Sequence, residues 1–258
     1  MTGSEDHFSG VAESYAAYRP DYPEALFAWV AEQSPSRGLA WDVGAGSGQA
    51  SLGLAAHFDH VLATDMSADL IELAPAHPRV AYVVGRAETS GLPDASVDLV
   101  AVGQALHWFD LEAFYAEVRR VLVPGGLFAA WSYGILHLQG PEVNQVFQAF
   151  YRHSVAPYWP AERRHVESGY RTIPFPFDEI AAPPFQMVAR WPLAELLGYC
   201  RSWSAVARFR RARQTDPVAE LEAGLREIWG DPQQRRTLSW PLTIRAGRVP
   251  AAGPRETG

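Results

Sequence analysis

Residues 39–65 read LAWDVGAGSGQASLGLAAHFDHVLATD, and this stretch decides the fold. LAWDV has the length and apolar composition of a buried strand, and a glycine-rich turn follows it. After the turn, apolar residues return at helical spacing, and HVLATD at 60–65 is a second apolar run that ends in an acid. A strand, a glycine turn, a helix and another strand predict a βαβ unit with parallel strands.

The alternation continues to about residue 134. VAYVVG at 80–85, SVDLVAVG at 96–103 and LFAAWSY at 127–133 are predicted strands, and a helix is predicted to begin after Asp110, its N-cap. Strands that alternate with helices indicate a doubly wound α/β fold around a mostly parallel sheet. Beyond residue 134 we expect helices at about 140–155 and 194–230, and strands at FQMVARWPL (185–193) and TLSWPLTIRAG (237–247).

The chain has 258 residues, and no shift in composition marks a linker. We therefore predict one domain over 1–258 with a helical and aromatic cover. Its expected parts are a core at about 36–134 and 184–246, an N-terminal lid at about 8–33, a cover insertion at about 135–183 and a mobile tail at about 249–258.

Composition limits the partners. Lys+Arg 22 against Asp+Glu 29 gives a net charge of −7, which disfavours nucleic acid and anionic membranes. No signal peptide or membrane span is recognisable, and the lone Cys200 permits no intrachain disulfide, so we expect a cytoplasmic protein. Local exceptions are Arg208, Arg210, Arg211 and Arg213, which indicate either a solvated helix face or a site for an anionic partner or substrate.

The glycine turn predicts a nucleotide-like ligand. Gly44, Gly46 and Gly48 allow a sharp turn and close approach of the backbone, and the next helix begins with unpaired N–H groups. Asp65 ends the second strand, where a carboxylate can accept both ribose hydroxyls.

Two cofactor classes suit such a turn. A dinucleotide fingerprint requires G-x-G-x-x-G, and counting from Gly44 places Gln49 at the third glycine position. The charge of Asp42 is also unfavourable beside a pyrophosphate, whereas S-adenosylmethionine has no phosphate and carries an ammonium that a carboxylate attracts. The sequence therefore favours S-adenosylmethionine.

The same residues carry a family resemblance. The turn resembles motif I of class I S-adenosylmethionine-dependent methyltransferases, and GRAETSGLPDASVDLV at 85–100 and LVPGGLFAAW at 122–131 resemble their later segments. FSGVAESYAAYRPDYP at 8–23 and GQALHWFD at 103–110 resemble the type 11 branch, which includes trans-aconitate-like small-molecule methyltransferases. This resemblance implies a Rossmann-like seven-stranded sheet, methyl transfer to a small molecule, release of S-adenosylhomocysteine and no metal.

The expected cofactor-binding residues come from the turn, the following strand ends and the N-terminal segment. They are Asp42, Gly44, Ala45, Gly46, Gly48, Asp65, Met66, Ala87, Glu88, Gln104, Tyr15 and Arg19. Arg86 stands where many relatives have an acid, so Ala87 and Glu88 remain the candidates near the adenine amine.

GQALHWFD follows a predicted strand beside the glycine turn, so it should face the reactive half of the cofactor. His107 is the candidate catalytic residue: a base for a hydroxyl or amine acceptor, or an orienting group for a carboxylate. A structural role as a helix cap stays open. Tyr18, Trp108, Trp131 and Tyr133 are the candidate acceptor-binding residues.

Other functions are disfavoured but open. An NAD(P)-dependent oxidoreductase and a catalytically inactive cofactor-binding protein are the alternatives, and the Asn/Asp-Pro-Pro-Tyr sequence of nucleic-acid amino-methyltransferases is not present after the strand that ends at Gly103. The sequence does not identify the acceptor, the methylated atom or the oligomeric state.

Overall fold

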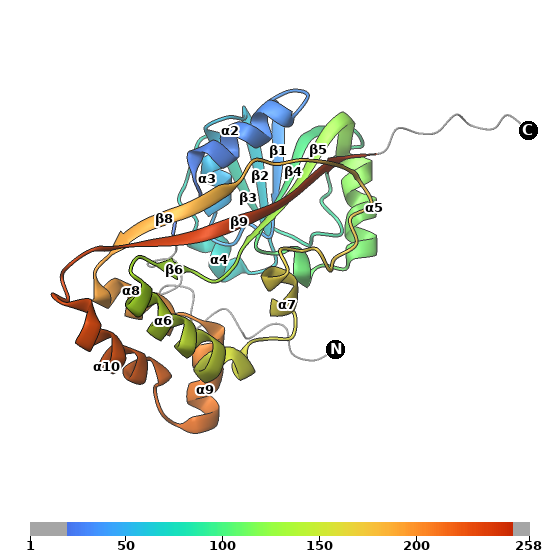
Figure 1. The fold of residues 1–258 in the computed structure, drawn as a ribbon. Coiled ribbons are helices and arrows are strands. Elements are labelled where there is room, and N and C mark those ends of the chain that lie inside the picture. The colour runs from blue at the N-terminus through green and yellow to red at the C-terminus, as the bar shows by residue number, and fades with distance from the viewer. Residues whose placement is uncertain (1–19, 250–258) are drawn as a thin grey trace, which may run out of the picture. The chain divides into compact units, whose positions relative to one another are not determined.

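A computed structural model describes residues 20–249, and five parallel strands in it share one sheet in the order β3-β2-β1-β4-β5 (Figure 1). The strands are β1 (Leu39–Val43), β2 (His60–Asp65), β3 (Val80–Val84), β4 (Val97–Gly103) and β5 (Leu122–Tyr133). Their order reverses between β1 and β4, which creates the crevice where ligands bind in open parallel sheets. The predicted mostly parallel α/β fold is confirmed.

The last strand, β9 (Arg236–Arg248), runs antiparallel to β5 from Leu127↔Arg248 to Tyr133↔Leu242. The short β7 (Asp178–Ile180) pairs with β9 from Asp178↔Arg248 to Ile180↔Ala246. The described chain contains nine strands. The two beyond the predicted seven are β7 and β6 (His137–Leu138), which have only three and two residues and leave little sequence signal.

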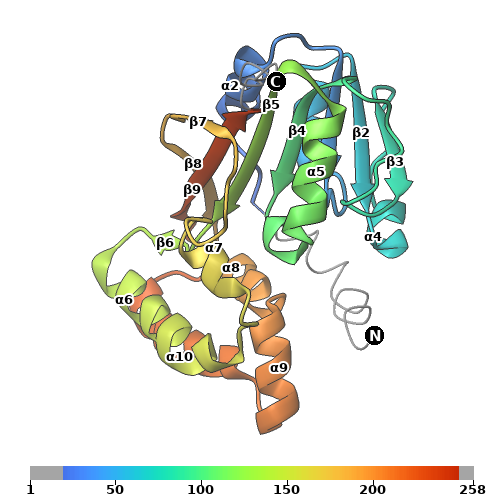
Figure 2. The same cartoon turned by 90° about the vertical axis from the view of Figure 1, so that its right-hand side faces the viewer.

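Helices cover both faces of the parallel sheet. Figures 1 and 2 show α5 (Leu111–Val121) on one face and α2 (Glu24–Gln33) with α3 (Gln49–Ala55) on the other. Helix α5 begins as predicted, because the Asp110 carboxylate accepts a hydrogen bond from the Ala113 N–H at 3.3 Å. Ser67 likewise caps α4 (Ala68–Glu72) through the Leu70 N–H.

The core of this region is aromatic and aliphatic. Trp41 and Phe114 lie fully buried with ring centroids 6.3 Å apart, and Phe128 packs edge-on against Phe114 at 5.8 Å. Tyr170 and Phe177 belong to the same cluster, although they come from the 165–185 segment far along the chain. Burial of these large rings supplies much of the free energy that holds the sheet and α5 together.

A second group of elements is mainly helical. It includes α6 (Pro141–Ala149), the π-helical turn η2 (Phe150–Val155), the 3-10 turn η3 (Ala156–Tyr158), α8 (Leu193–Arg201), α9 (Ser204–Arg213) and α10 (Pro217–Trp229). Helix α10 buries its apolar residues, among them Val218, Leu221 and Leu225, at the spacing of a single helix face. Strands β6 and β8 (Phe185–Trp191) pair with β9, and the short α7 spans Arg163–Glu167.

These elements fall into two compact units. The larger holds residues 22–133, 165–185 and 242–249 of the described chain, and the smaller holds 20–21, 134–164 and 186–241. The sequence placed 184–246 in the core, whereas 186–241 group with 134–164, because α9 and α10 pack with α6 and its neighbouring turns and α8 packs with α9 and α10. That the chain is a single domain stays a prediction.

Two further expectations can be compared with the structure. Cys200 is fully buried, and this burial raises the pKa of its thiol, as expected for an inert apolar cysteine. None of the helices within residues 20–249 is long and apolar enough to span a bilayer.

The packing of α3 against α2 depends on Gly53. A Cβ atom at this position would lie 2.1 Å from Cε2 of the Phe27 ring. We predict that Gly53→Ala lowers the free energy of unfolding by about 1 to 3 kcal/mol through overpacking, measured by urea denaturation. Gly134→Ala is the control, since its Cβ would meet no atom within 4 Å; equal stability of the two variants would contradict the prediction.

Candidate active site

The carboxyl ends of β1, β2 and β4 lie at one edge of the sheet. Asp42 of β1 is in register with Ala63 of β2 and with Ala101 of β4. The glycine loop at 44–48 therefore follows β1 at the edge where 104–109 follow β4 and Asp65 ends β2. The predicted meeting of these segments is what the structure shows.

The glycine loop touches the segment after β4 directly. Gly44 has a φ of +69°, and a Cβ there would lie 2.5 Å from the Cβ of Ala105 and 3.2 Å from Cζ of Phe109. Any side chain at this position would therefore clash and would also strain the backbone. Glycine at 44 lets the two loops pack together at the crevice.

Asp65 accepts hydrogen bonds that order the glycine loop and the turn after β2. Its Oδ2 accepts a hydrogen bond from the Gly46 N–H at 2.8 Å, and its Oδ1 accepts one from the Ser67 N–H at 2.9 Å. A Cβ at Gly46 would meet no atom of residues 20–249 within 4 Å, so this part of the chain leaves space above the loop. A carboxylate oxygen can accept more than one hydrogen bond, so Asp65 can still receive ribose hydroxyls.

Asp42 lies buried beneath the loop. Its Oδ2 accepts a hydrogen bond of 2.6 Å from the Ser51 hydroxyl on α3. Tyr82 packs under the same loop, because a Cβ at Gly48 would lie 2.5 Å from the Tyr82 oxygen. Burial, with a smaller contribution from the charge of Asp42, raises the pKa of the Tyr82 hydroxyl above its ordinary value. The site therefore contains a buried negative charge close to the loop.

The predicted adenine segment is tied to the start of α5. Ala87 is buried in the core cluster. Glu88 Oε1 accepts a hydrogen bond from the Asp110 N–H at 3.1 Å, and Arg86 Nε lies 3.3 Å from Glu88 Oε2. Arg86 thus pairs with the neighbouring carboxylate. Which group contacts the adenine amine stays a prediction.

Glu117 of α5 anchors the loop after this segment. Its Oε1 accepts hydrogen bonds from the Ser90 N–H at 2.7 Å and from the Ser90 hydroxyl at 2.5 Å. Arg120 Nε donates to its Oε2 at 2.8 Å. The hydrogen bonds from Arg120, followed by those from Ser90, outweigh the effect of burial and lower the pKa of Glu117 to about 2.

Gln104, the first residue after β4, has a strained backbone. Its φ is +61°, a left-handed conformation that non-glycine residues seldom adopt. Two hydrogen bonds hold it there: its N–H donates to the Trp131 carbonyl at 2.9 Å, and its Nε2 donates to the Tyr133 carbonyl at 3.1 Å. Such strain concentrates at functional sites, where surrounding contacts maintain it.

His107 lies in the short turn η1 (Leu106–Trp108) between two other rings. Its Nδ1 is 3.3 Å from the Tyr170 hydroxyl, and its ring centroid is 4.7 Å from that of Trp108. Trp108 is 51% exposed, so one side of this ring group is open to solvent. Sequence analysis did not predict Tyr170, which lies 63 positions beyond His107 and follows Gly169 in a left-handed turn.

Trp131 and Tyr133 are both buried at the end of β5. The Trp131 indole Nε1 has no hydrogen-bond partner among residues 20–249. A Cβ at Gly103 would lie 3.1 Å from this nitrogen and 3.2 Å from the Tyr22 hydroxyl. Glycine at 103 thus lets the β4 backbone pack closely against these two side chains, where any side chain would be crowded.

The remaining predicted residues are placed differently. Met66 is 59% exposed directly after Asp65. Tyr15, Tyr18 and Arg19, the expected lid residues, lie outside the described part of the chain. No group of His, Cys, Asp and Glu side chains suited to a metal ion occurs among residues 20–249.

A Rossmann-like sheet with a glycine loop after β1 and an acid at the end of β2 defines the class of proteins that bind nucleoside cofactors at this edge. Comparison with known families specifies the class further. Residues 41–130, which include both features, match the model of a methyltransferase domain of type 11.

Relatives extend this match along the chain. A protein of Dictyostelium discoideum, provisionally named a methyltransferase, is 34% identical over 87% of this chain and 86% of its own length. A methyltransferase of Aspergillus candidus is 30% identical over 63% of this chain and 59% of its own.

A solved structure from Anaeromyxobacter dehalogenans, provisionally named a type II methyltransferase, has a TM-score of 0.86 at 51% identity, covering 91% of this chain and all of that one. The chain therefore belongs to the class I S-adenosylmethionine-dependent methyltransferases of the type 11 group.

The anchor at Glu117 predicts a dependence of stability on pH. Because the pKa of Glu117 is lowered to about 2 from 4.5, its contribution is complete above pH 4.5 and is lost as the pH falls towards 2. We expect Glu117→Gln to lower the free energy of unfolding by about 1 to 3 kcal/mol at pH 7 and less at pH 3, measured by urea denaturation. The control is Glu112→Gln on the exposed face of the same helix; a loss independent of pH would contradict the role.

Proposed function

We propose that this methyltransferase acts on a small-molecule acceptor that carries a hydroxyl or carboxylate, at the crevice above β1, β4 and β5. The carrying observation is the direct packing of Gly44 against Ala105 and Phe109, since it joins the cofactor loop to the segment that bears His107. A methyl donor above the first loop would then face the side chains of the second.

The residues present fit S-adenosylmethionine. Asp65 is oriented by two backbone N–H groups, the open face of Gly46 leaves space above the loop, and buried Asp42 supplies negative charge near the expected position of the ammonium. The cofactor, when bound, supplies a methyl group on a sulfonium, which is already a good leaving group. The remaining task of the protein is to bind, align and, for a hydroxyl, deprotonate the acceptor.

His107 is the proposed catalytic residue. The contact of Nδ1 with the Tyr170 hydroxyl fixes the orientation of the ring, and the ring of Trp108 packs beside it. In this orientation Nε2 is the atom proposed to accept the proton of a hydroxyl acceptor. For a carboxylate acceptor, the same nitrogen would donate a hydrogen bond and align it.

Trp131 is proposed to donate a hydrogen bond to an oxygen of the acceptor or the cofactor. The buried Trp131 N–H has no acceptor among the described residues, and an oxygen bound here would satisfy it. Trp131 is fully buried, so we propose that its contribution is this single donor rather than its ring face. Tyr133 and Trp108 stay proposed acceptor-binding residues.

The ribose contact is tested with Asp65→Asn. Loss of the charged acceptor should weaken S-adenosylhomocysteine binding by about 10- to 100-fold, measured by isothermal titration calorimetry. Asp69→Asn, an exposed acid in the first turn of α4, is the matched control. Unchanged affinity in Asp65→Asn would restrict this carboxylate to ordering the loop.

The base is tested with His107→Asn. We expect kcat to fall by about 100-fold or more for a hydroxyl acceptor, while S-adenosylhomocysteine affinity changes by less than about threefold. Tyr170→Phe, which removes the hydroxyl that contacts Nδ1, should shift the pH profile of kcat without abolishing turnover. Parallel losses of kcat and cofactor affinity would assign His107 a structural role.

The acceptor class is tested by turnover on matched carboxylic acids, phenols, alcohols and amines, detected through formation of S-adenosylhomocysteine. Methylation of hydroxyl or carboxylate compounds is the expected result. Selective methylation of amines, or of a protein or nucleic acid, would overturn the proposal while leaving the family assignment intact.

A further inference from the structure

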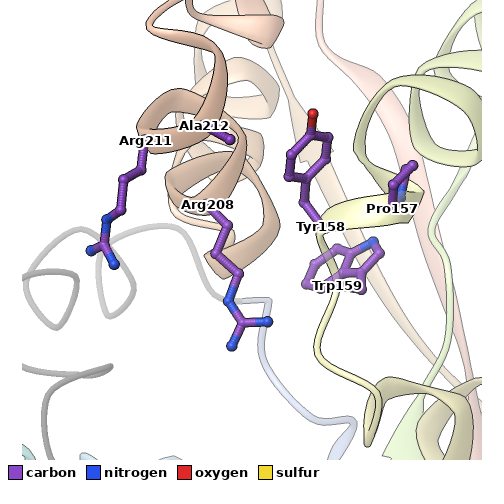
Figure 3. A pocket seen from close by; sticks show the side chains of 6 residues that line it. All are labelled: Pro157, Tyr158, Trp159, Arg208, Arg211 and Ala212. Carbon is purple, nitrogen blue, oxygen red and sulfur yellow. The ribbon is translucent and has the colours of Figure 1, made fainter. Parts of the chain in front are cut away.

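The smaller unit contains a pocket lined mainly by arginine and aromatic side chains. Its volume is about 400 Å³, and Figure 3 shows its lining: Pro157, Tyr158, Trp159, Arg208, Arg211 and Ala212. The arginines extend from α9, and the rings come from η3 and the residue after it. None of the lining residues within the described range 20–249 is acidic.

The four arginines predicted as either a solvated face or an anion site divide into two pairs. Arg210 lies 2.9 Å from Asp216 Oδ1, and Arg213 Nε donates to the Tyr158 hydroxyl at 2.9 Å. Arg208 and Arg211 both line the pocket, and no carboxylate partner of Arg211 occurs among residues 20–249. The pocket therefore brings two guanidinium groups together in a chain whose net charge is −7.

The aromatic wall is held in place by its own contacts. Tyr158 packs against Phe209 with centroids 4.9 Å apart, and Trp159 packs against Trp203 at 5.6 Å. The indole nitrogen of Trp159 is buried and has no hydrogen-bond partner within the described chain. The wall is therefore a preformed apolar surface, and a ligand that reaches the buried indole N–H would satisfy it.

From these contacts we infer that the pocket binds an anionic small molecule, with a carboxylate or phosphate against Arg208 and Arg211 and an apolar or aromatic body against Tyr158 and Trp159. Guanidinium groups form charge-assisted, bidentate hydrogen bonds with such anions, and aromatic rings favour a flat ligand body. This binding does not depend on the proposed chemistry at His107.

The same chemistry has two possible sources: the anionic group of the methyl acceptor, or a separate anionic effector. Both require the same four contacts at the pocket. Kinetic measurements distinguish the two sources.

The direct test is calorimetry on the full chain with benzoate and phenyl phosphate as probes and benzyl alcohol as the uncharged analogue. Both anions should bind at least about tenfold more tightly than benzyl alcohol, and their affinity should fall as salt increases. The double variant Arg208→Gln/Arg211→Gln should weaken anion binding by about 10- to 100-fold. Equal binding of charged and uncharged probes to the natural chain, or no binding, would overturn the inference.

Arg190→Gln is the matched control, because Arg190 is an exposed arginine on β8 that does not line the pocket. It should bind the anions as the natural chain does. A second variant, Trp159→Phe, keeps an aromatic wall and removes the indole N–H; it should weaken the anions by a smaller factor than the double arginine variant. Anion binding that survives the double variant but is lost in Arg190→Gln would place the site elsewhere and overturn the inference.

S-adenosylhomocysteine titration separates this inference from the proposed function. Cofactor binding without anion binding would reject the pocket alone, and anion binding to a chain that methylates only amines would reject the proposed acceptor class alone. If the anion belongs to the acceptor, the double variant should raise KM for carboxylate acceptors and leave KM for their neutral analogues unchanged. If the anion is an effector, KM should stay constant for both while probe binding is lost.

Discussion

The absence of a side chain at Gly44 is the constraint on which the rest of the site depends. The loop after β1 and the segment after β4 can pack together only because nothing projects from this position towards Ala105 and Phe109. Phe109 in turn packs on Phe114 of α5 with centroids 4.9 Å apart. The lack of a Cβ atom at Gly44 thus allows the cofactor loop, the His107 segment and the core beneath them to pack together.

Hydrogen bonds then convert this close packing into a defined geometry. Asp65 fixes the loop through the Gly46 N–H, and the Trp131 and Tyr133 carbonyls hold Gln104 in a left-handed conformation. Left-handed backbone costs free energy at a non-glycine residue, so these bonds are needed to maintain it. This edge of the sheet is therefore preorganised, so the binding of a ligand costs less conformational entropy.

The sequence predicted those parts of the structure whose determinants are local. The alternation of apolar runs with glycine turns was sufficient for β1 to β5, and Asp110 as an N-cap identified where α5 begins. The position of Asp65 at a strand end followed from the same pattern. These features are set by residues a few positions apart, so they are recognisable in the sequence.

The parts that were not predicted depend on contacts between distant residues. Tyr170 reaches His107 across 63 positions, and its left-handed backbone follows from packing rather than from a local signal. The grouping of 186–241 with 134–164 is likewise set by helix faces that pack only after the chain has folded. Arg210 and Arg211 are adjacent in sequence, yet one pairs with Asp216 and the other lines the pocket. A run of charges therefore becomes a specific site only when the fold assigns each side chain its own neighbours.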